Sequence, residues 1–236
     1  MAELVVAESL LALLKEIDTP TVCNAIEVAQ GRRGFNRFTV GTMQHSRPSA
    51  PAIVGFARTA MISGAAPAKE SAATLSDRRR SYYRYMATGT VPAVAVIEDV
   101  DFPSAIGAWW GEVNVAVHKG LGMLGAVTNG VMRDLDAIDP GFPVLAGSIG
   151  VSHGFVHVVE TGIPVDVMGM HVEPGELIHA DRHGALVIPA EVIPELEGAM
   201  NSVVSREAIV LGPAQAVDFS IEKLEIAWAA YEAARK

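Results

Sequence analysis

The chain has 236 residues and 50% of them are hydrophobic, which is enough to bury a full core in a single domain. Its 27 acidic residues outnumber its 18 basic residues, and the net charge of −9 argues against a nucleic-acid-binding surface, while its apolar runs fall far short of the ~20 residues that span a bilayer. One cysteine, Cys23, allows no internal disulfide and no secretory leader is recognisable, so the sequence predicts a cytoplasmic protein that binds neither nucleic acid nor membrane.

The first half of the chain alternates between helical and strand patterns. Thr19 and Pro20 are typical of a helix start, and Gly31 and Gly89 are typical of helix ends. The patterns predict helices over Glu8 to Ile17, Thr19 to about Gln30 and Ala72 to Ala87, and strands over Ile53 to Ile62 and Val91 to Ile97.

The second half is richer in short strands, which Gly and Pro turns separate. We find no repeat and no low-complexity linker, so we expect one domain over residues 1–236 with a helical C-terminal extension from about residue 190. The patterns predict strands over Pro143 to Ala146, Phe155 to Glu160, Pro164 to Val167 and His171 to Val172, a β-hairpin-like pair over Glu176 to Ile188, and helices over Ala190 to about Leu211 and Ser220 to Ala234.

A helix start with free backbone amides is predicted at Gly111. This glycine precedes a periodic apolar stretch with Glu112 in its first turn, and Gly120 and Gly122 end that stretch. The free N–H groups of a first helical turn bind anions. The apolar segment Leu124 to Thr128 favours a buried strand that runs back toward the helix start.

Arg133 and Asp134 follow this strand after a turn at Asn129, a residue suited to positive φ, where an α/β protein usually presents its chemistry. Adjacent side chains diverge on a regular strand or helix, but on a turn both can face one pocket. The guanidinium can then stabilise a developing oxyanion while the carboxylate binds a divalent metal. The sequence therefore predicts that Arg133 and Asp134 belong to a functional site.

The chain resembles the RraA-like proteins, whose catalytic members are class II pyruvate aldolases such as 4-hydroxy-4-methyl-2-oxoglutarate/4-carboxy-4-hydroxy-2-oxoadipate aldolase. That family carries an acidic residue, twenty intervening positions and then Arg-Asp, a spacing that Glu112 and Arg133-Asp134 keep. Further matches are Gly122-x-x-Gly125, Asn129-Gly130 and the run from Pro174 to Pro189, and together they cover roughly residues 15 to 210.

The resemblance implies a fold and a reaction. The fold is an α/β single domain of swivelling β/β/α layers with mixed sheets and C-terminal helices, rather than the doubly wound sheet that alternation alone favours. The reaction is metal-dependent cleavage of a 4-hydroxy-2-oxo acid, or of oxaloacetate, to pyruvate through an enolate. In it Arg133 stabilises the enolate oxygen, Asp134 binds Mg²⁺, Mn²⁺ or another divalent cation, and Glu112 acts through a metal-bound water.

Substrate binding is expected at Gly111, Glu112, Val113 and Asn114 together with Arg133. The amides of Val113 and Asn114 would bind the carboxylate of the small-molecule 2-oxo acid. The family often has Asp followed by two leucines where this chain has Glu112, Val113 and Asn114. Backbone amides do not depend on side chains, so their role carries over, and Asn114 adds a possible substrate contact.

Two statements about partners follow from the resemblance. Relatives complete the site with an acid from a neighbouring subunit's C-terminal helical region, for which Glu207 is the candidate here, so a homotrimer or homohexamer is expected. The alternative is a non-catalytic RraA-type regulator that binds a ribonuclease assembly. Such regulators lack the metal-binding acid after the arginine, so Asp134 favours the enzyme.

Glycine-rich motifs do not support a nucleotide cofactor. Gly120-x-Gly122-x-x-Gly125 matches the dinucleotide fingerprint in letters, but it follows a predicted helix and precedes a strand, the reverse of the order that such a site needs. A methyltransferase of quinone synthesis, a function sometimes attached to similar sequences, is disfavoured for the same reason.

The Arg78-Arg79-Arg80 run beside Tyr82 to Tyr85 allows three hypotheses. In an acidic chain a solvated helix face is favoured, an arginine that reaches the distal carboxylate of a dianionic substrate is second, and an RNA-stacking patch is third. Lys119 could form a Schiff base in another aldolase class, but its place near a helix end favours a charge that complements the helix dipole.

The histidines are interpreted as structural. His153 and His157 lie in a Gly- and Val-rich setting that favours core or turn roles. His179, Asp181 and His183 alternate as metal ligands on a strand can. A hairpin turn over Asp181 to Gly184 with exposed histidines is the favoured interpretation.

Overall fold

The computed structural model describes residues 6–234, and two long apolar runs form the centre of its main sheet. These are β2 (Ile53–Ser63) and β3 (Ala93–Asp99), which pair in parallel and are buried over most of their length. The eight-stranded sheet has the order β1–β7–β5–β3–β2–β12–β13, and β9 also pairs with β2. The other strands of this sheet are β1 (Gln44–His45), β5 (Met123–Thr128), β7 (Val144–Ala146), β9 (His157–Thr161), β12 (Leu177–Asp181) and β13 (Gly184–Ile188).

The sheet is mixed. Strands β2, β3, β5 and β7 run parallel to one another, whereas β1, β9 and β12 pair antiparallel with their neighbours in this group. The fold class is therefore α/β with a curled mixed sheet and C-terminal helices, as predicted.

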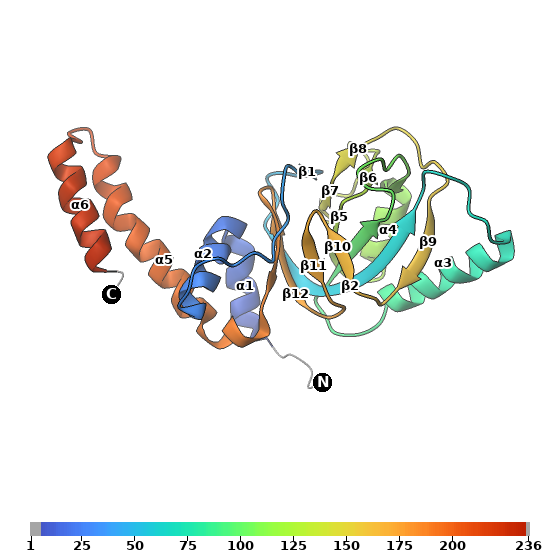
Figure 1. Cartoon of the computed structure of the whole chain (residues 1–236), viewed down its shortest axis with the longest axis horizontal. Coiled ribbons are helices and arrows are strands. Elements are labelled where there is room, and N and C mark those ends of the chain that lie inside the picture. Colours follow the sequence, from blue (N-terminus) through green and yellow to red (C-terminus); the bar gives the residue numbers. More distant parts are fainter. Residues whose placement is uncertain (1–5, 235–236) are drawn as a thin grey trace. The chain divides into compact units, whose positions relative to one another are not determined.

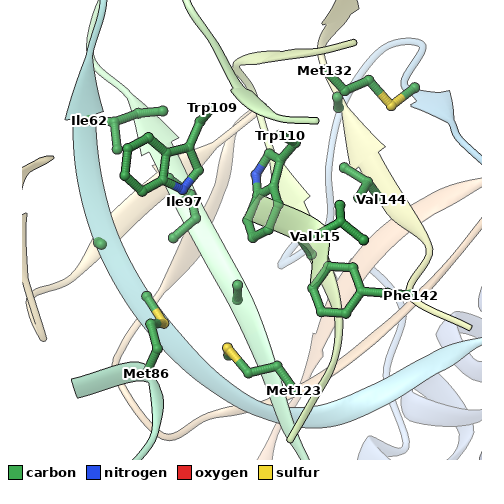
Figure 2. Close-up of a cluster of buried hydrophobic side chains, with 14 of the residues drawn as sticks. Ile62, Met86, Ile97, Trp109, Trp110, Val115, Met123, Met132, Phe142 and Val144 are labelled. Atoms are coloured by element: carbon green, nitrogen blue, oxygen red, sulfur yellow. The ribbon is translucent and has the colours of Figure 1, made fainter. Parts of the chain in front are cut away.

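Both faces of this sheet are covered, which explains the unbroken apolar runs. Successive side chains of β3 alternate, so that Ala95 and Ile97 enter one core while Val94 and Val96 enter the other. Large aromatic and sulfur-containing side chains fill the first core (Figure 2). The second core is covered by the antiparallel hairpin of β10 (Val165–Val167) and β11 (Met170–Val172).

Two helices and a small sheet occupy the first face. Helix α3 (Ala72–Met86), capped by the Ser71 hydroxyl, packs along β9 and β2 (Figure 1). Helix α4 (Glu112–Gly120) packs on β5. The small sheet has the parallel order β4–β6–β8, where β4 is Ala108–Trp110, β6 is Val131–Met132 and β8 is Ser148–Ile149.

The chain divides into two units. The first contains all the strands and α1 (Glu8–Glu16), and comprises the N-terminal segment to Thr19 with Asn36–Ala190. The second comprises Pro20–Phe35 and the chain from Glu191 onward. It holds all but the first residue of α2 (Thr19–Gln30), and it holds α5 (Ile193–Ala214), which packs against α6 (Ile221–Ala233). A short 3₁₀ helix, Ala190–Val192, spans the boundary between the units. A single domain over residues 1–236 stays a prediction. Within residues 6–234, no helix is long and apolar enough to cross a membrane.

The predicted helices and longer strands are confirmed to within a few residues at their ends. Four strands of two or three residues, β1, β4, β6 and β8, were not predicted. The prediction of positive φ at Asn129 is wrong: the non-glycine residues with positive φ in the described chain are Asp134 and Met168. Asn129 is instead buried, because its side chain bonds to the end of β3.

Candidate functional site

A cavity of about 850 Å³ lies in the first unit, beside the small sheet. Its wall is built from α3 and the segment before it, from the start of α4, from the turn after β6, and from the segment His153–Val158. The predicted site residues Gly111, Val113, Asn114, Arg133 and Asp134 all line it. The structure thus brings five of the six predicted positions to one cavity.

The sixth predicted position, Glu112, contributes its backbone. Its side chain is exposed and is not one of those that line the cavity. Its backbone N–H donates a hydrogen bond to Asp134 Oδ2 at 3.3 Å. The structure therefore places the Glu112 amide in contact with Asp134, while its side chain is not part of the cavity lining.

The N-cap residue of α4, Gly111, has no side chain to cap the helix, and the Asp134 carboxylate accepts from the Glu112 amide in the first turn. The amides of the first helical turn have no carbonyl partner within the helix. Two of these amides belong to Val113 and Asn114, whose residues line the cavity. Together with the helix dipole, such amides form a site that favours an anion.

Gly111 also allows the turn at Arg133 and Asp134 to pack against the helix start. A Cβ added at Gly111 would lie 2.6 Å from Asp134 Oδ2 and 3.2 Å from Arg133 Cγ. These separations are shorter than van der Waals contact, so any other residue would displace the two side chains. The glycine is required here for close approach and not for its own φ, which is an extended −159°.

Arg133 and Asp134 lie side by side on a strained turn. Arg133 directly follows β6, and its backbone N–H donates to the carbonyl of Trp110 at 2.8 Å. Asp134 has φ of +57°, a conformation that non-glycine residues seldom adopt and that is found disproportionately at functional sites. Arg133 Nε lies 3.4 Å from Asp134 Oδ2, and both side chains are about one third exposed, at 34% and 37%.

Asp134 is the one carboxylate on this turn that faces the cavity, and it limits how a metal can be held. Among the described residues, no three His, Cys, Asp or Glu side chains form a group that could hold a metal ion. A small hard cation such as Mg²⁺ is commonly held by one or two carboxylates, with waters and substrate completing its shell. The described residues fit that mode, with Asp134 as the carboxylate ligand in the cavity, and do not fit an all-protein site.

A hydrogen-bonded group fixes the start of α4. Tyr83 of α3 donates its hydroxyl hydrogen bond to Asn114 Oδ1 at 2.8 Å, and Asn114 Nδ2 donates to the carbonyl of Trp109 at 2.6 Å. Both polar ends of the Asn114 side chain are therefore occupied by protein. The expected substrate contact of Asn114 is better supplied by its backbone amide.

A second layer of the same group is fully buried. His118 Nδ1 lies 2.6 Å from the carbonyl of Asn114, which can only accept, so Nδ1 carries the hydrogen. Burial lowers the pKa of His118 to about 4, so its Nε2 is an acceptor and receives the Tyr82 hydroxyl at 2.6 Å. The Tyr82 oxygen in turn accepts from Trp109 Nε1 at 3.3 Å. Each donor has an acceptor, which makes the α3–α4 contact rigid.

The remaining cavity wall carries one arginine, one glutamate and two histidines among mostly apolar residues. Arg79 of α3 lies over the Trp109 ring, with its guanidinium carbon 5.7 Å from the ring centre. His153 and His157 also line the cavity, and each ring bonds through Nδ1 to a main-chain carbonyl one or two residues away. Nothing in their sequence spacing indicated this, because they reach the cavity from the loop and strand β9 only through the tertiary fold.

Other candidate residues lie away from the cavity. Lys119 forms a salt bridge with Asp139 at 2.7 Å near the C-terminal end of α4, as expected for a helix-end charge. Glu207 lies in the second unit. The turn between Asp181 and Gly184 is confirmed.

The prediction of exposed histidines at this hairpin holds for His183 and is wrong for His179. His179 is fully buried because its two ring nitrogens bond to the Thr19 hydroxyl at 3.0 Å and to the carbonyl of Leu14 at 2.8 Å. It ties β12 to the N-terminal helical segment.

Comparisons with known proteins give a family context for the chain. A family model described as RraA-like, Aldolase/RraA, matches residues 19–187. An uncharacterized protein of Methanocaldococcus jannaschii, MJ0644, is 35% identical over 97 residues, which are 40% of this chain and 47% of that relative; the matched part thus spans about half of the relative's length.

Solved structures share the fold at 20% identity. An uncharacterized protein from Pseudomonas syringae pv. tomato matches with a TM-score of 0.70 over 98% of both chains. Streptomyces coelicolor RraAS2, described as an unusual member of the RNase ES inhibitor RraA protein family, matches with a TM-score of 0.64 over 89% of this chain and 98% of its own.

Proposed function

Because the chain belongs to the RraA-like family, we propose that it is a divalent-metal-dependent lyase that releases pyruvate from a 4-hydroxy-2-oxo acid or from oxaloacetate. The family includes metal-dependent aldolases and decarboxylases as well as non-catalytic RNase E inhibitors. The observation that carries the choice is the position of Asp134 beside Arg133 on a cavity that the start of α4, with Gly111 as its N-cap, also lines.

In this proposal the protein binds the pyruvoyl end of the substrate at the start of α4. The amides of Val113 and Asn114 donate to the substrate carboxylate, and the positive end of the helix dipole favours its charge. Tyr83 and Asn114 hold this helix start in place through their side-chain hydrogen bond. The amides are therefore oriented before the substrate arrives, which lowers the entropic cost of binding.

Arg133 stabilises the charge that develops during bond cleavage. Retro-aldol cleavage and decarboxylation both leave negative charge on the 2-oxo oxygen of the pyruvoyl group. A guanidinium presented from a fixed turn stabilises such charge more than it stabilises the neutral ketone. The hydrogen bond from the Arg133 amide to the carbonyl of Trp110 anchors its backbone to β4.

Asp134 would hold a divalent cation, Mg²⁺ or Mn²⁺, with Glu112 contributing through a bound water. The cation would act as a Lewis acid at the 2-oxo group. A neighbouring subunit in a homotrimer or homohexamer would supply a further acid, for which Glu207 is the candidate. A non-catalytic regulator has no need of a carboxylate at position 134, so Asp134 favours the enzyme.

The first test is pyruvate release from a panel of 4-hydroxy-2-oxo acids and oxaloacetate, coupled to a dehydrogenase. We expect at least one substrate to be cleaved with Mg²⁺ or Mn²⁺, activity to disappear with EDTA, and activity to return when metal is restored. Borohydride added with substrate should leave the enzyme active, because no Schiff base forms. Covalent trapping at Lys119, or full activity in EDTA, would overturn the mechanism.

A further inference from the structure

The cavity is larger than the pyruvoyl end of a substrate requires. Its volume of about 850 Å³ falls in the upper part of the range found for pockets that hold drug-sized ligands, on the order of 300–1,000 Å³. A three-carbon oxo acid at the start of α4 would leave most of this space for the rest of the substrate. The side chains that α3 contributes to the cavity wall therefore indicate the chemistry of the rest of the substrate.

Arg79 is the unmatched cation among three consecutive arginines. Arg78 pairs with Glu70 at 3.0 Å, and Arg80 pairs with Asp77 one turn earlier on α3. Arg79 lines the cavity, and no carboxylate among the described residues forms a salt bridge with it. Arg79 is therefore a cation on the cavity wall whose charge is available to an anion from outside.

The guanidinium of Arg79 makes a cation–π contact with Trp109. The indole ring is 4% exposed and its N–H donates to Tyr82, so the ring has one fixed orientation. Arg79 lies over that ring at 5.7 Å from its centre. A cation–π contact favours a guanidinium position over the ring while leaving its N–H groups free to form two parallel bonds to an oxyanion.

The other charged groups of the cavity add to this preference. Glu70 is the only acidic side chain besides Asp134 in the described lining, and Arg78 already neutralises it. His153 and His157 each place Nδ1 within 2.9 Å of a main-chain carbonyl, so Nδ1 carries a hydrogen and Nε2 has no protein partner among the described residues. Neither histidine opposes an anion.

Arg79 is also close to the predicted pyruvoyl site along α3. It precedes Tyr83 by one helical turn, roughly 6 Å of rise, and Tyr83 contacts Asn114 at the start of α4. A substrate of five or six carbons bound by the α4 amides would extend about this far.

We propose that Arg79 binds a second oxyanion of the substrate, a carboxylate or a phosphate, at the end remote from the 2-oxo acid group. Arg79 is then the residue that makes this enzyme select dianionic 2-oxo acids over monoanionic ones. The identity of the first, pyruvoyl half rests on the proposed function. The presence of an oxyanion site at Arg79 rests on the charges and contacts of the cavity wall, independently of the reaction.

The test uses binding of unreactive analogues to the full chain in Mg²⁺, measured by calorimetry. 2-Oxoglutarate and 2-oxopentanoate share a five-carbon 2-oxo acid chain and differ in carrying a carboxylate or a methyl group at the far end; 2-oxo-4-phosphonobutanoate carries a phosphonate there. We expect the wild type to bind at least one dianion about tenfold more tightly than 2-oxopentanoate, and the tighter dianion identifies the preferred oxyanion.

Arg79→Met should abolish this preference while leaving 2-oxopentanoate affinity unchanged, and Arg79→Lys should restore part of it. Arg80→Met is the matched control, because Arg80 pairs with Asp77 and does not line the cavity. Equal affinity of the wild type for all three analogues, no binding of any of them, or an unchanged preference in Arg79→Met would each overturn the proposal.

The outcome is separable from that of the proposed function. If the Arg79-dependent preference is found but no substrate yields pyruvate, the oxyanion site stands and the reaction is wrong. If pyruvate is released and Arg79→Met keeps the full preference, the reaction stands and the site is wrong.

Discussion

Gly111 is the position where the geometry of the site depends on a missing side chain. An alanine Cβ would collide with Asp134 Oδ2, which is the mobile end of a side chain and not part of the backbone. The φ of Gly111 lies in the extended region that alanine adopts without strain. The collision should therefore displace the carboxylate of Asp134 and leave the fold intact.

Gly111→Ala is expected to lower pyruvate release by roughly 10²-fold, because small displacements of reacting groups have effects of that size. Its free energy of unfolding should change by less than about 1 kcal/mol. Kinetics and denaturant unfolding of the variant check both. Gly120→Ala, at the other end of α4 with no atom near the added Cβ, is the control and should be as active as the wild type. Wild-type activity in Gly111→Ala would show that the contact with Asp134 is unimportant.

At the scale of elements, the ends of β3 and β5 are joined by side chains. Asn129 after β5 accepts from the Asp99 backbone N–H at 2.6 Å and donates to the Asp99 carbonyl at 3.1 Å, so its amide continues the strand pairing. The Asp99 carboxyl is 1% exposed and its Oδ2 has no partner among the described residues. Burial raises the pKa of Asp99 to about 6, and the nearby Asp101 carboxylate adds to the shift.

This junction predicts a pH-dependent stability. Below about pH 4, Asp99 is protonated in both the folded and the unfolded state, and it contributes no difference. Between about pH 4 and 6 the unfolded chain loses the proton first, so stability falls, and above pH 6 the loss is constant. A shift of about two pKa units corresponds to a loss of about 3 kcal/mol.

Asp99→Asn removes the titrating group and keeps an acceptor for the Asp101 amide. We expect the variant to exceed the wild type in free energy of unfolding by about 1–3 kcal/mol at pH 8, and to match it near pH 4. Urea unfolding across this pH range measures the difference. Parallel curves of unfolding free energy against pH for the two proteins would show that Asp99 is not the source of the pH dependence.

At the scale of the whole molecule, the sequence predicts those elements whose pattern lies in their own residues, and it does not predict features that tertiary contacts create. Strands β2 and β3 were predicted because burial on both faces leaves a continuous apolar run, and α4 was predicted because Gly111 and Gly120 bound it. Strands β4, β6 and β8 are too short to show a period. The turn at Arg133 was predicted from its place after a buried apolar strand, and the family spacing from Glu112 supported that prediction.

The α3 side of the site was less accessible to sequence analysis. Arg79 is one of three adjacent arginines in the sequence. Only the tertiary structure shows that Arg78 and Arg80 form salt bridges with acidic side chains while Arg79 lies over Trp109. The Tyr82–His118 contact joins two helices across 36 positions of sequence, a separation at which no spacing rule applies.

The central claim is that Asp134 makes pyruvate release depend on a divalent cation. The most direct measurement is the initial rate of pyruvate release from oxaloacetate as a function of Mg²⁺ concentration, corrected for the reaction without enzyme, for the wild type, Asp134→Ala and Asp136→Ala. Asp136 is an exposed aspartate two residues away that does not line the cavity. Wild type and Asp136→Ala should show rates that saturate with Mg²⁺, and Asp134→Ala should stay at the enzyme-free rate while keeping its circular dichroism spectrum. A Mg²⁺-saturable rate in Asp134→Ala equal to that of the wild type would contradict the account.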